Sequence, residues 1–424
     1  MKKIIIYIFI VTSSLQLAFG QNLKQANLLY QKKAFIEAAK LYEAEAPKTL
    51  EIYKKLGDSY YFNANIKQAY INYKQVVDNY KDVDPIYIFR YIQTLKGLKK
   101  YDEADAWMLK YNEMENLPMQ YKTSTFKQNL ENSALETFQI KPSSINTSGS
   151  EFAPSFYNDK IVYASTQTNT KLYPWNNLPY LDLFIAEVNN GDLKNSKPFS
   201  TTINTKFHEA NAVFTKDGKT VYFTSNNYNK QLLKKAKKVN YLKIYSAQLV
   251  DGKWTNIKEL PFNSDNYSVA HPTLNSDETK MYFASDMPSS LGSFDIYEVS
   301  IDNNGNFGTP SNLGNKVNTI HKEQFPFISE NNTLYFASNG HQGFGGLDIF
   351  KTNLQNNKFQ EPKNLGNTIN SNLDDFSFIV NEADNVGYLA SNRSGGKGSD
   401  DIYRFTRELH YIIEGVTKDK NTLK

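Results

Sequence analysis

The sequence contains no cysteine among its 424 residues. This absence excludes disulfide bonds and thiolate zinc sites, and it removes the cysteine that bacterial lipoproteins need for acylation. The five histidines fall at different positions of the repeat described below, so no repeated metal ring is expected. The sequence also lacks G-x-S-x-G, H-E-x-x-H and EF-hand motifs, so it indicates no catalytic residue, metal or cofactor. We therefore expect a protein without enzymatic activity.

Long apolar runs are missing as well, and no segment is suited to span a bilayer. The apolar run at residues 4–11 is short, follows two lysines and precedes a small-residue ending, AFG, at residue 18. This order predicts a secretory signal peptide over residues 1–20, cleaved before Gln21. Cleavage would leave 46 of the 48 basic residues against 44 acidic ones, a balance that argues against nucleic-acid binding. We expect an exported, periplasmic protein.

From residue 22 to about residue 114 the helical patterns contain no internal proline, and alanines and aromatic residues recur at helical spacing. A small residue followed four positions later by a large one appears three times, at steps of 31 and 35 residues: Ala38/Tyr42, Ala69/Tyr73 and Ala104/Met108. Residues 21–117 resemble tetratricopeptide repeats, with a linker or capping helix at 118–135. The resemblance implies a protein-docking groove, and the alternative is a stack that only spaces or caps the next domain.

Between about residues 136 and 409 the apolar pattern changes to period two with closely spaced turns, which is typical of β-structure. Five units repeat, and their first strands read APSF at 153, NAVF at 211, HPTL at 271, FPFI at 325 and DFSF at 375. Glycine-rich stretches separate the second and third strands of the last units. A phosphate-binding loop is followed by a helix, whereas these stretches are followed by a strand. They are therefore not predicted to bind phosphate. The aspartates that begin the third strands, Asp295, Asp348 and Asp401, are expected to accept hydrogen bonds from these turns.

The connections between units also repeat, as INT at 145 and 203, DNY at 265, VNT at 317 and INS at 369. The stretch FQIKPSS at 138 matches the fourth-strand region FQEPKNL at 359, whereas the last unit has no fourth strand of its own. The simplest closure places the strand at 138–141 on the final unit, which removes an exposed sheet edge. The sequence therefore predicts a five-bladed β-propeller over residues 136–409, with six blades as the alternative.

The five units resemble PD40 (WD40-like) propeller repeats, and residues 410–424 resemble the opening strand of a carboxypeptidase regulatory-like domain. This order of segments is similar to the PorE-like group of OmpA-family envelope proteins of type IX secretion and gliding systems. The resemblance implies association with the outer membrane and a partner such as a PorP/SprF-like β-barrel or another secretion component. Peptidoglycan binding belongs to a C-terminal domain that is not in this sequence, so it is not assigned to any residue here.

Four acidic residues precede the first strands in four of the five units: Glu151, Glu209, Glu323 and Asp374. First strands line the channel of a propeller, so these carboxylates are expected to surround one mouth of it. They either cap backbone N–H groups in their own blades or form an acidic ring for a cation or a basic peptide. Repulsion within a close ring would raise some of the pKa values.

Two loops between second and third strands are enlarged. The loop at 166–180 holds the aromatic residues Tyr173, Trp175 and Tyr180, which either fold back on the blade or anchor a partner. The loop at 229–243 holds Lys234, Lys235, Lys237 and Lys238, which form either a solvated surface or a docking patch for an anionic partner. Both loops and the four acids should lie on one face of the propeller, which we predict to be the recognition face.

Two functions follow from this reading. The first is a periplasmic, non-enzymatic scaffold whose helices and recognition face bind components of a type IX secretion or gliding machinery. The alternative is a propeller that binds a small ligand, a glycan or a peptide, or hydrolyses one, at the acidic channel mouth.

Overall fold

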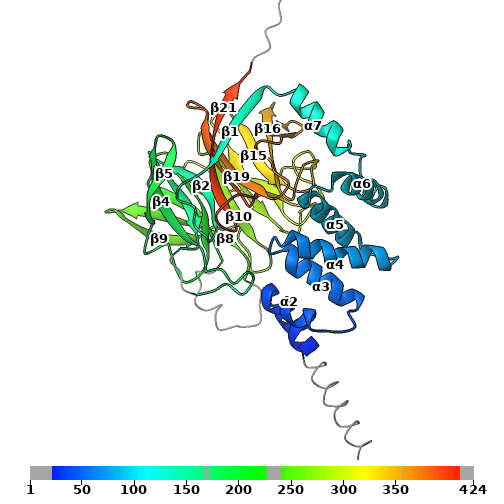
Figure 1. Ribbon diagram of the computed structural model, residues 1–424. Helices are drawn as coiled ribbons and strands as arrows, with labels where there is room; N and C mark the ends of the chain where they lie inside the picture. The colour runs from blue at the N-terminus through cyan, green and yellow to red at the C-terminus, as the bar shows by residue number, and fades with distance from the viewer. Residues whose placement is uncertain (1–21, 168–170, 227–239, 357, 411–424) are drawn as a thin grey trace, which may run out of the picture.

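The computed structural model describes residues 22–167, 171–226, 240–356 and 358–410. Within them, an N-terminal helical region lies beside a five-bladed β-propeller (Figure 1). The prediction of helices followed by five blades is confirmed. The signal sequence, the lysine-rich stretch and all of the C-terminal segment except His410 lie outside the described residues. No helix in the described part of the chain is long and apolar enough to cross a membrane.

The helical region begins with helical residues 22–31 and continues with helices that pack on one another in chain order. These are α2 (Phe35–Glu43), α3 (Leu50–Tyr61), α4 (Ile66–Asn79), α5 (Pro85–Gly97), α6 (Tyr101–Glu115) and α7 (Thr123–Asn132). Side-chain caps begin three of them, because Thr49, Asn65 and Asp84 accept hydrogen bonds from backbone N–H groups of α3, α4 and α5. The local sequence thus sets the start of each of these helices.

Small residues let neighbouring helices approach closely, as the spacing of the alanine and aromatic residues predicted. Ala69 and Tyr73 in α4 are fully buried. A Cβ atom on Gly57 of α3 would lie 2.3 Å from the Tyr73 ring, so only glycine allows this approach. The large residues fill the space that the small ones leave, and the resulting core holds the stack together.

Each of the first three blades is a four-stranded antiparallel sheet in chain order. Blade 1 contains β2 (Glu151–Tyr157), β3 (Lys160–Ser165), β4 (Asp182–Asn189) and β5 (Asp192–Pro198). Blade 2 contains β6 (Glu209–Phe214), β7 (Thr220–Ser225), β8 (Lys243–Val250) and β9 (Lys253–Glu259). Blade 3 contains β10 (Val269–Leu274), β11 (Lys280–Ser285), β12 (Asp295–Ser300) and β13 (Ser311–Asn312).

The last two blades complete the ring. Blade 4 contains β14 (Glu323–Ile328), β15 (Thr333–Ser338) and β16 (Asp348–Gln355), with the short strands β17 (Lys358–Phe359) and β18 (Lys363–Asn364) both paired to β16. Blade 5 contains β19 (Asp375–Asn381), β20 (Val386–Ser391) and β21 (Asp401–Leu409). The first strands contact one another around the channel, including β19 with β2, so the ring is closed.

The predicted strand that completes the last blade is present. It is β1 (Glu136–Pro142), which pairs antiparallel with β21, so that Phe138 stands opposite Arg407. The Phe138 ring packs against Phe405 at 5.6 Å, edge to face. The last sheet therefore has the order β1-β21-β20-β19, with its outer strand taken from ahead of the first blade.

The glycine-rich turns are structural, as predicted. Asp295 accepts hydrogen bonds from the backbone N–H groups of Leu291 and Gly292, at 2.7 and 3.0 Å. Asp348 and Asp401 accept equivalent bonds from the turns that precede them. These carboxylates join the second and third strands of their blades.

Candidate functional site

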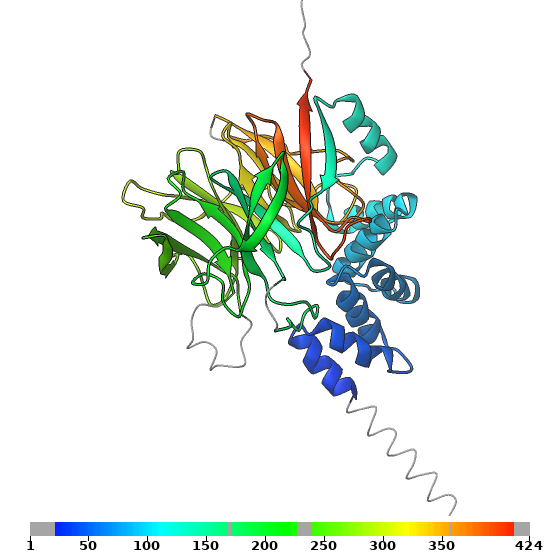
Figure 2. The ribbon, with the colours of Figure 1, turned by 60° about the vertical axis from the view of Figure 1, so that its left-hand side comes forward.

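The propeller has two unlike faces. We call the face with the connections between blades and between second and third strands the connection face, and the face with the short hairpins the hairpin face. The helices lie against the connection face (Figures 1 and 2). The contacts come largely from α5: the Phe89 ring stacks on the His321 ring at 3.5 Å, and the Asn372 amide donates to the Gly97 carbonyl at 2.6 Å. Part of the predicted recognition face is therefore occupied by the helices of the same chain.

The three aromatic residues of the enlarged blade 1 loop are engaged inside the molecule. The Trp175 ring lies 4.8 Å from the Phe35 ring, and its Nε1–H donates to the Phe62 carbonyl at 3.0 Å. Tyr173 and Tyr180 both pack against the His208 ring, each at 4.5 Å between ring centroids. The loop joins blade 1 to the helices. Lys234, Lys235, Lys237 and Lys238 lie outside the described residues.

Three of the four predicted channel-mouth acids, Glu151, Glu209 and Glu323, are fully buried. Each accepts hydrogen bonds from the backbone N–H and hydroxyl of the threonine four residues earlier: Thr147, Thr205 and Thr319, all at 2.7–2.8 Å. A serine at the end of the second strand donates a further bond to each. These carboxylates cap their own blades, so they do not present an open acidic ring.

Burial controls the ionisation of these acids. It raises the pKa of Glu209 to about 8 and that of Glu323 to about 7, although the hydrogen bonds from threonine and serine lower both values. Repulsion from a neighbouring aspartate raises each pKa further, but less than burial does. Asp182 acts in this way on Glu209, and Asp295 acts on Glu323. The raised pKa values therefore come from desolvation and not from mutual repulsion around a ring.

Asp374 does not occupy the position equivalent to these glutamates. Asp375 pairs with Ser391 in the register of the other blades, and its carboxylate accepts a bond from the Ser371 N–H, four residues earlier. Asp374 accepts instead from the Leu347 N–H at 2.8 Å. The spacing of threonine or serine four residues before the acid was the signal that could have identified the capping role and the correct aspartate.

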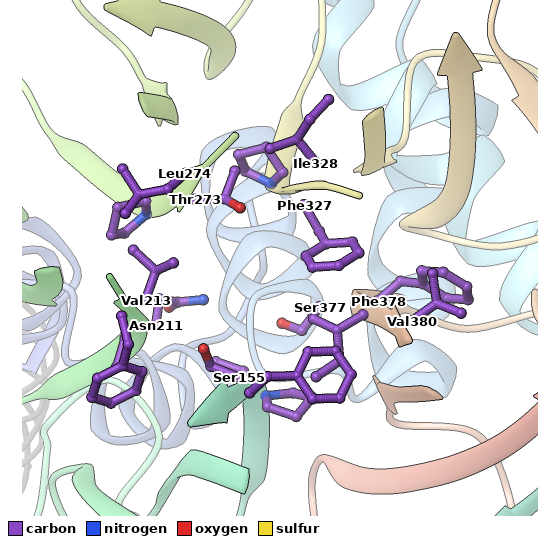
Figure 3. Close-up of a pocket in the computed structure, with 18 of the residues that line it drawn as sticks. Ser155, Asn211, Val213, Thr273, Leu274, Phe327, Ile328, Ser377, Phe378 and Val380 are labelled. Atoms are coloured by element: carbon purple, nitrogen blue, oxygen red, sulfur yellow. The ribbon is translucent and has the colours of Figure 1, made fainter. Parts of the chain in front are cut away.

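The channel is open at the hairpin face, where the structure holds a cavity of about 370 Å³ that sequence reasoning missed. We call this cavity the channel well. First strands of all five blades line it, and Ser155, Asn211, Val213, Thr273, Phe327 and Ser377 gather around its centre (Figure 3). The candidate site is therefore at the end of the channel opposite the helices.

Five β-bulges form the floor of the well. In every first strand one extra residue interrupts the pairing with the second strand. The extra residue has a left-handed backbone with φ between 47° and 57°: Ala153, Asn211, His271, Phe325 and Ser377. This conformation is uncommon for residues other than glycine and strained by about 1 kcal/mol each. Three of these residues, Ala153, His271 and Phe325, directly precede a proline. This position before a proline was the feature of the sequence that could have predicted the bulges.

An aromatic cluster lies beside this floor. Phe325 stacks on the His271 ring at 3.9 Å and packs on Phe376 at 4.9 Å, and Phe152 packs against both phenylalanines. Phe152 and Phe376 precede the bulges and so lie toward the connection face. These rings form part of one small core cluster between the first strands. Burial lowers the pKa of His271 to about 3, so its imidazole is neutral at pH 7.

The well combines apolar walls with uncharged polar groups. Ser377 is 7% exposed, and its Oγ has no hydrogen-bond partner in the structure. This oxygen is itself buried, so Ser377 contributes to the floor of the well, whereas the side chains of Ser155 and Asn211 are partly exposed in it. Carboxylates occur only at the mouth, where Glu278 and Glu382 accept hydrogen bonds from backbone N–H groups of the neighbouring blade, and Glu330 also lines the cavity. In the described residues no cluster of three metal-ligating side chains is found.

No family model and no curated protein matches this chain. Several solved structures are similar to part of this chain at low identity. An α-L-arabinofuranosidase from Lactobacillus brevis is 12% identical, with a TM-score of 0.39 over 61% of this chain and 90% of that chain. An exo-β-1,3-galactanase from Clostridium thermocellum is 11% identical, with a TM-score of 0.39 over 62% and 61%. A puromycin-hydrolyzing peptidase from Mycobacterium tuberculosis is 14% identical, with a TM-score of 0.31 over 59% and 45%.

These structures contradict the expectation of a protein without enzymatic activity, because the solved propellers that this chain resembles are enzymes by name. The expectation depended on missing sequence motifs. Short motifs detect reactive groups that are close in sequence, whereas a propeller channel assembles side chains from blades that are far apart in it. Missing motifs are therefore no argument against activity. With TM-scores of 0.31–0.39, the likeness assigns no reaction to this chain.

Proposed function

We propose that this protein binds the end of a neutral, hydroxyl-rich ligand such as a glycan in the channel well. The observation that carries the proposal is a cavity open at one end, in which the partly exposed side chains of Ser155 and Asn211 lie with Thr273 and the Phe327 ring (Figure 3). The well is lined by residues of the hairpin face, such as Glu278, Glu330 and Glu382, so a ligand would enter from that face. The volume of about 370 Å³ is within the range of small-ligand sites and suits one or two sugar rings.

The chemistry of the lining favours this ligand class over a charged one. Ser155, Thr273 and Asn211 present hydroxyl and amide groups toward the centre, beside the Phe327 ring (Figure 3). Hydroxyls and amides can both donate and accept hydrogen bonds, and an aromatic ring offers an apolar surface to the C–H face of a sugar. The glutamates at the mouth are the carboxylates placed to take part in hydrolysis if the bound chain is cleaved.

The test is ligand-observed NMR of the full chain against a panel of neutral mono- and oligosaccharides, with short uncharged peptides as a parallel panel. Ser155→Phe should fill the well and abolish binding. Ser311→Phe, on the exposed edge strand β13, is the matched control and should leave binding unchanged. Binding of neither panel, or equal binding by the Ser155→Phe variant, would reject the well as the site. Binding of peptides alone would keep the site and reject the ligand class.

A second candidate is docking of another protein on the outer side of the helices, for which the type IX resemblance suggests an outer-membrane component. The observation that favours it is a set of exposed large apolar side chains: Leu28, Ile71 and Met114 are 42–51% exposed. We propose that this surface binds the partner, since α5 and the loop after α3 are occupied by the propeller. Pull-down from envelope extracts with residues 21–409 should recover a secretion-system protein, and Ile71→Asp should lose it. Recovery unaffected by Ile71→Asp would reject this surface.

A further inference from the structure

A second cavity lies where the helices meet blade 4, apart from the channel well. Its volume is about 580 Å³. It is enclosed by α6, by the segment that leads into α7 and by the glycine-rich turn of blade 4. We call it the junction pocket. Nothing in the proposed function uses it.

The walls of the junction pocket are mainly apolar and are fixed in place. Met108 and Leu109 of α6 and Met119 of the connecting segment line it. The Gln342 side chain holds the segment by two hydrogen bonds to the backbone of Tyr121, accepting from its N–H at 3.3 Å and donating to its carbonyl at 2.5 Å. The pocket is thus built by contacts between two domains and not by one mobile loop.

Lys96 is the unusual group in this pocket. The residue is only 5% exposed, and its Nζ donates to the Gly343 carbonyl at 3.1 Å. Among the described residues, no carboxylate lies within 4.0 Å of this Nζ. Buried lysines are rare unless they are paired, because an ammonium group is costly to desolvate. Burial accordingly lowers the pKa of Lys96.

Asp348 and Asp105 both attract Lys96 and raise its pKa, which offsets part of the effect of burial, but among the described residues neither forms an ion pair with it within 4.0 Å. Asp348 attracts it, but burial raises the pKa of Asp348 well above its usual range, which favours the uncharged carboxyl. Asp105 lines the pocket, and both of its oxygens accept hydrogen bonds from Thr123, at 2.7 and 2.8 Å. Asp102 and Lys122 are exposed at the rim and carry opposite charges. A negative group supplied by a ligand would complete the pairing of Lys96.

We propose that the junction pocket binds a small amphipathic carboxylate, such as a medium-chain fatty acid, with its carboxylate on Lys96 and its chain along Met108, Leu109 and Met119. The volume is within the range of ligand pockets and accommodates a chain of about ten carbons. The apolar walls would contribute hydrophobic binding energy, and the buried ammonium would select the anionic headgroup.

The experiment is isothermal titration of the full chain with decanoate, decanol and decylamine. Decanoate should bind most tightly and decylamine should not bind measurably. Lys96→Met keeps the apolar stem of the side chain and removes its charge. It should weaken the affinity for decanoate at least tenfold and leave the affinity for decanol unchanged. Lys122→Ala, which removes an exposed charge at the rim, is the control and should change decanoate binding less than twofold.

Lys96 is buried, so its replacement can affect folding as well as ligand binding. Thermal unfolding of Lys96→Met is therefore measured in parallel to show that the variant is folded. Met119→Asp is a second variant that does not depend on a buried change, since Met119 is 63% exposed. It should weaken decanoate through repulsion near the pocket entrance. Decanoate binding that is unaffected by both variants, or decylamine binding as tight as that of decanoate, would overturn the proposal. Binding of peptides with a free C-terminal carboxylate in preference to decanoate would also overturn it.

Discussion

The two ends of the propeller channel carry acidic side chains at repeated positions, yet the two ends differ in accessibility. At the connection face Glu323 is fully buried, accepts three hydrogen bonds and lies under the helices. At the hairpin face Glu330 is exposed beside an open well. A repeated carboxylate is therefore no sign of a binding site by itself. The donors that surround it decide whether it stabilises the fold or meets a ligand.

The difference follows from the lengths of the connections. Long connections on one face can reach the helices, as Trp175 of blade 1 does with Phe62. The hairpins on the other face are too short to cross the channel, so they leave it open. The difference in connection length therefore explains why the helices dock on one face and the well opens at the other.

The largest effect is expected from removing the strand that closes the ring. A fragment that begins at residue 134 keeps β1, whereas one that begins at residue 143 lacks it. The shorter fragment should lose its cooperative unfolding transition, because blade 5 loses the packing of Phe138 and Ile140 and exposes the edge of β21. Thermal unfolding followed by circular dichroism distinguishes the two. Equal transitions would show that closure does not stabilise the channel.

Replacing a buried acid of the connection face should have the next largest effect. Glu323→Ala leaves the Thr319 N–H and two hydroxyls without their acceptor, which should cost about 3 kcal/mol of unfolding free energy. Urea denaturation measures this loss. Ligand binding in the channel well should be unchanged in the folded fraction. A fully stable variant would mean that Glu323 is not a structural cap.

The contact between helices and propeller should depend on pH through His321. Burial lowers its pKa in the folded state to about 4, compared with about 6.5 in an unfolded chain. Folding therefore favours the neutral ring, and this stability is present above pH 6.5 and is lost as the pH falls to about 4. Between pH 7 and pH 4.5 the native protein should lose on the order of 2 kcal/mol more than a His321→Phe variant. Identical pH profiles in urea denaturation would contradict this assignment.

The smallest effect on stability is expected at the open mouth. Glu330→Gln should change the unfolding free energy by less than about 0.5 kcal/mol, since Glu330 is exposed. It is the counterpart of Glu323→Ala and should act, if at all, on ligand affinity or turnover. A loss of stability as large as that of the Glu323 variant would remove the distinction between the two ends.

The repeats made the architecture predictable from the sequence. The match between the segments that begin at Phe138 and Phe359 was sufficient to predict the closing strand, because equivalent strands in different blades bury equivalent side chains. The alternation of alanine and aromatic residues predicted the helical packing for the same reason. Ala69 and Tyr73 are found where that pattern requires.

The candidate site was less predictable, because it depends on contacts between repeats. No local pattern links Trp175 to Phe62, so the docking of the helices on the predicted recognition face could not be foreseen. The bulges at His271 and Phe325 were visible only as residues before a proline, and their shared backbone geometry appears only in three dimensions. Burial of Glu209 likewise depends on five blades coming together.

The position of β1 also has a consequence for the order of folding. This strand is made before any blade, yet its partner β21 is the last strand of the ring. Until β21 is available, the nascent strand has no partner and its backbone hydrogen-bonding groups face solvent, which favours association between chains. Ring closure must therefore come late and join distant segments, which slows folding. A helper that shields residues 136–142 during synthesis would raise the yield of folded protein.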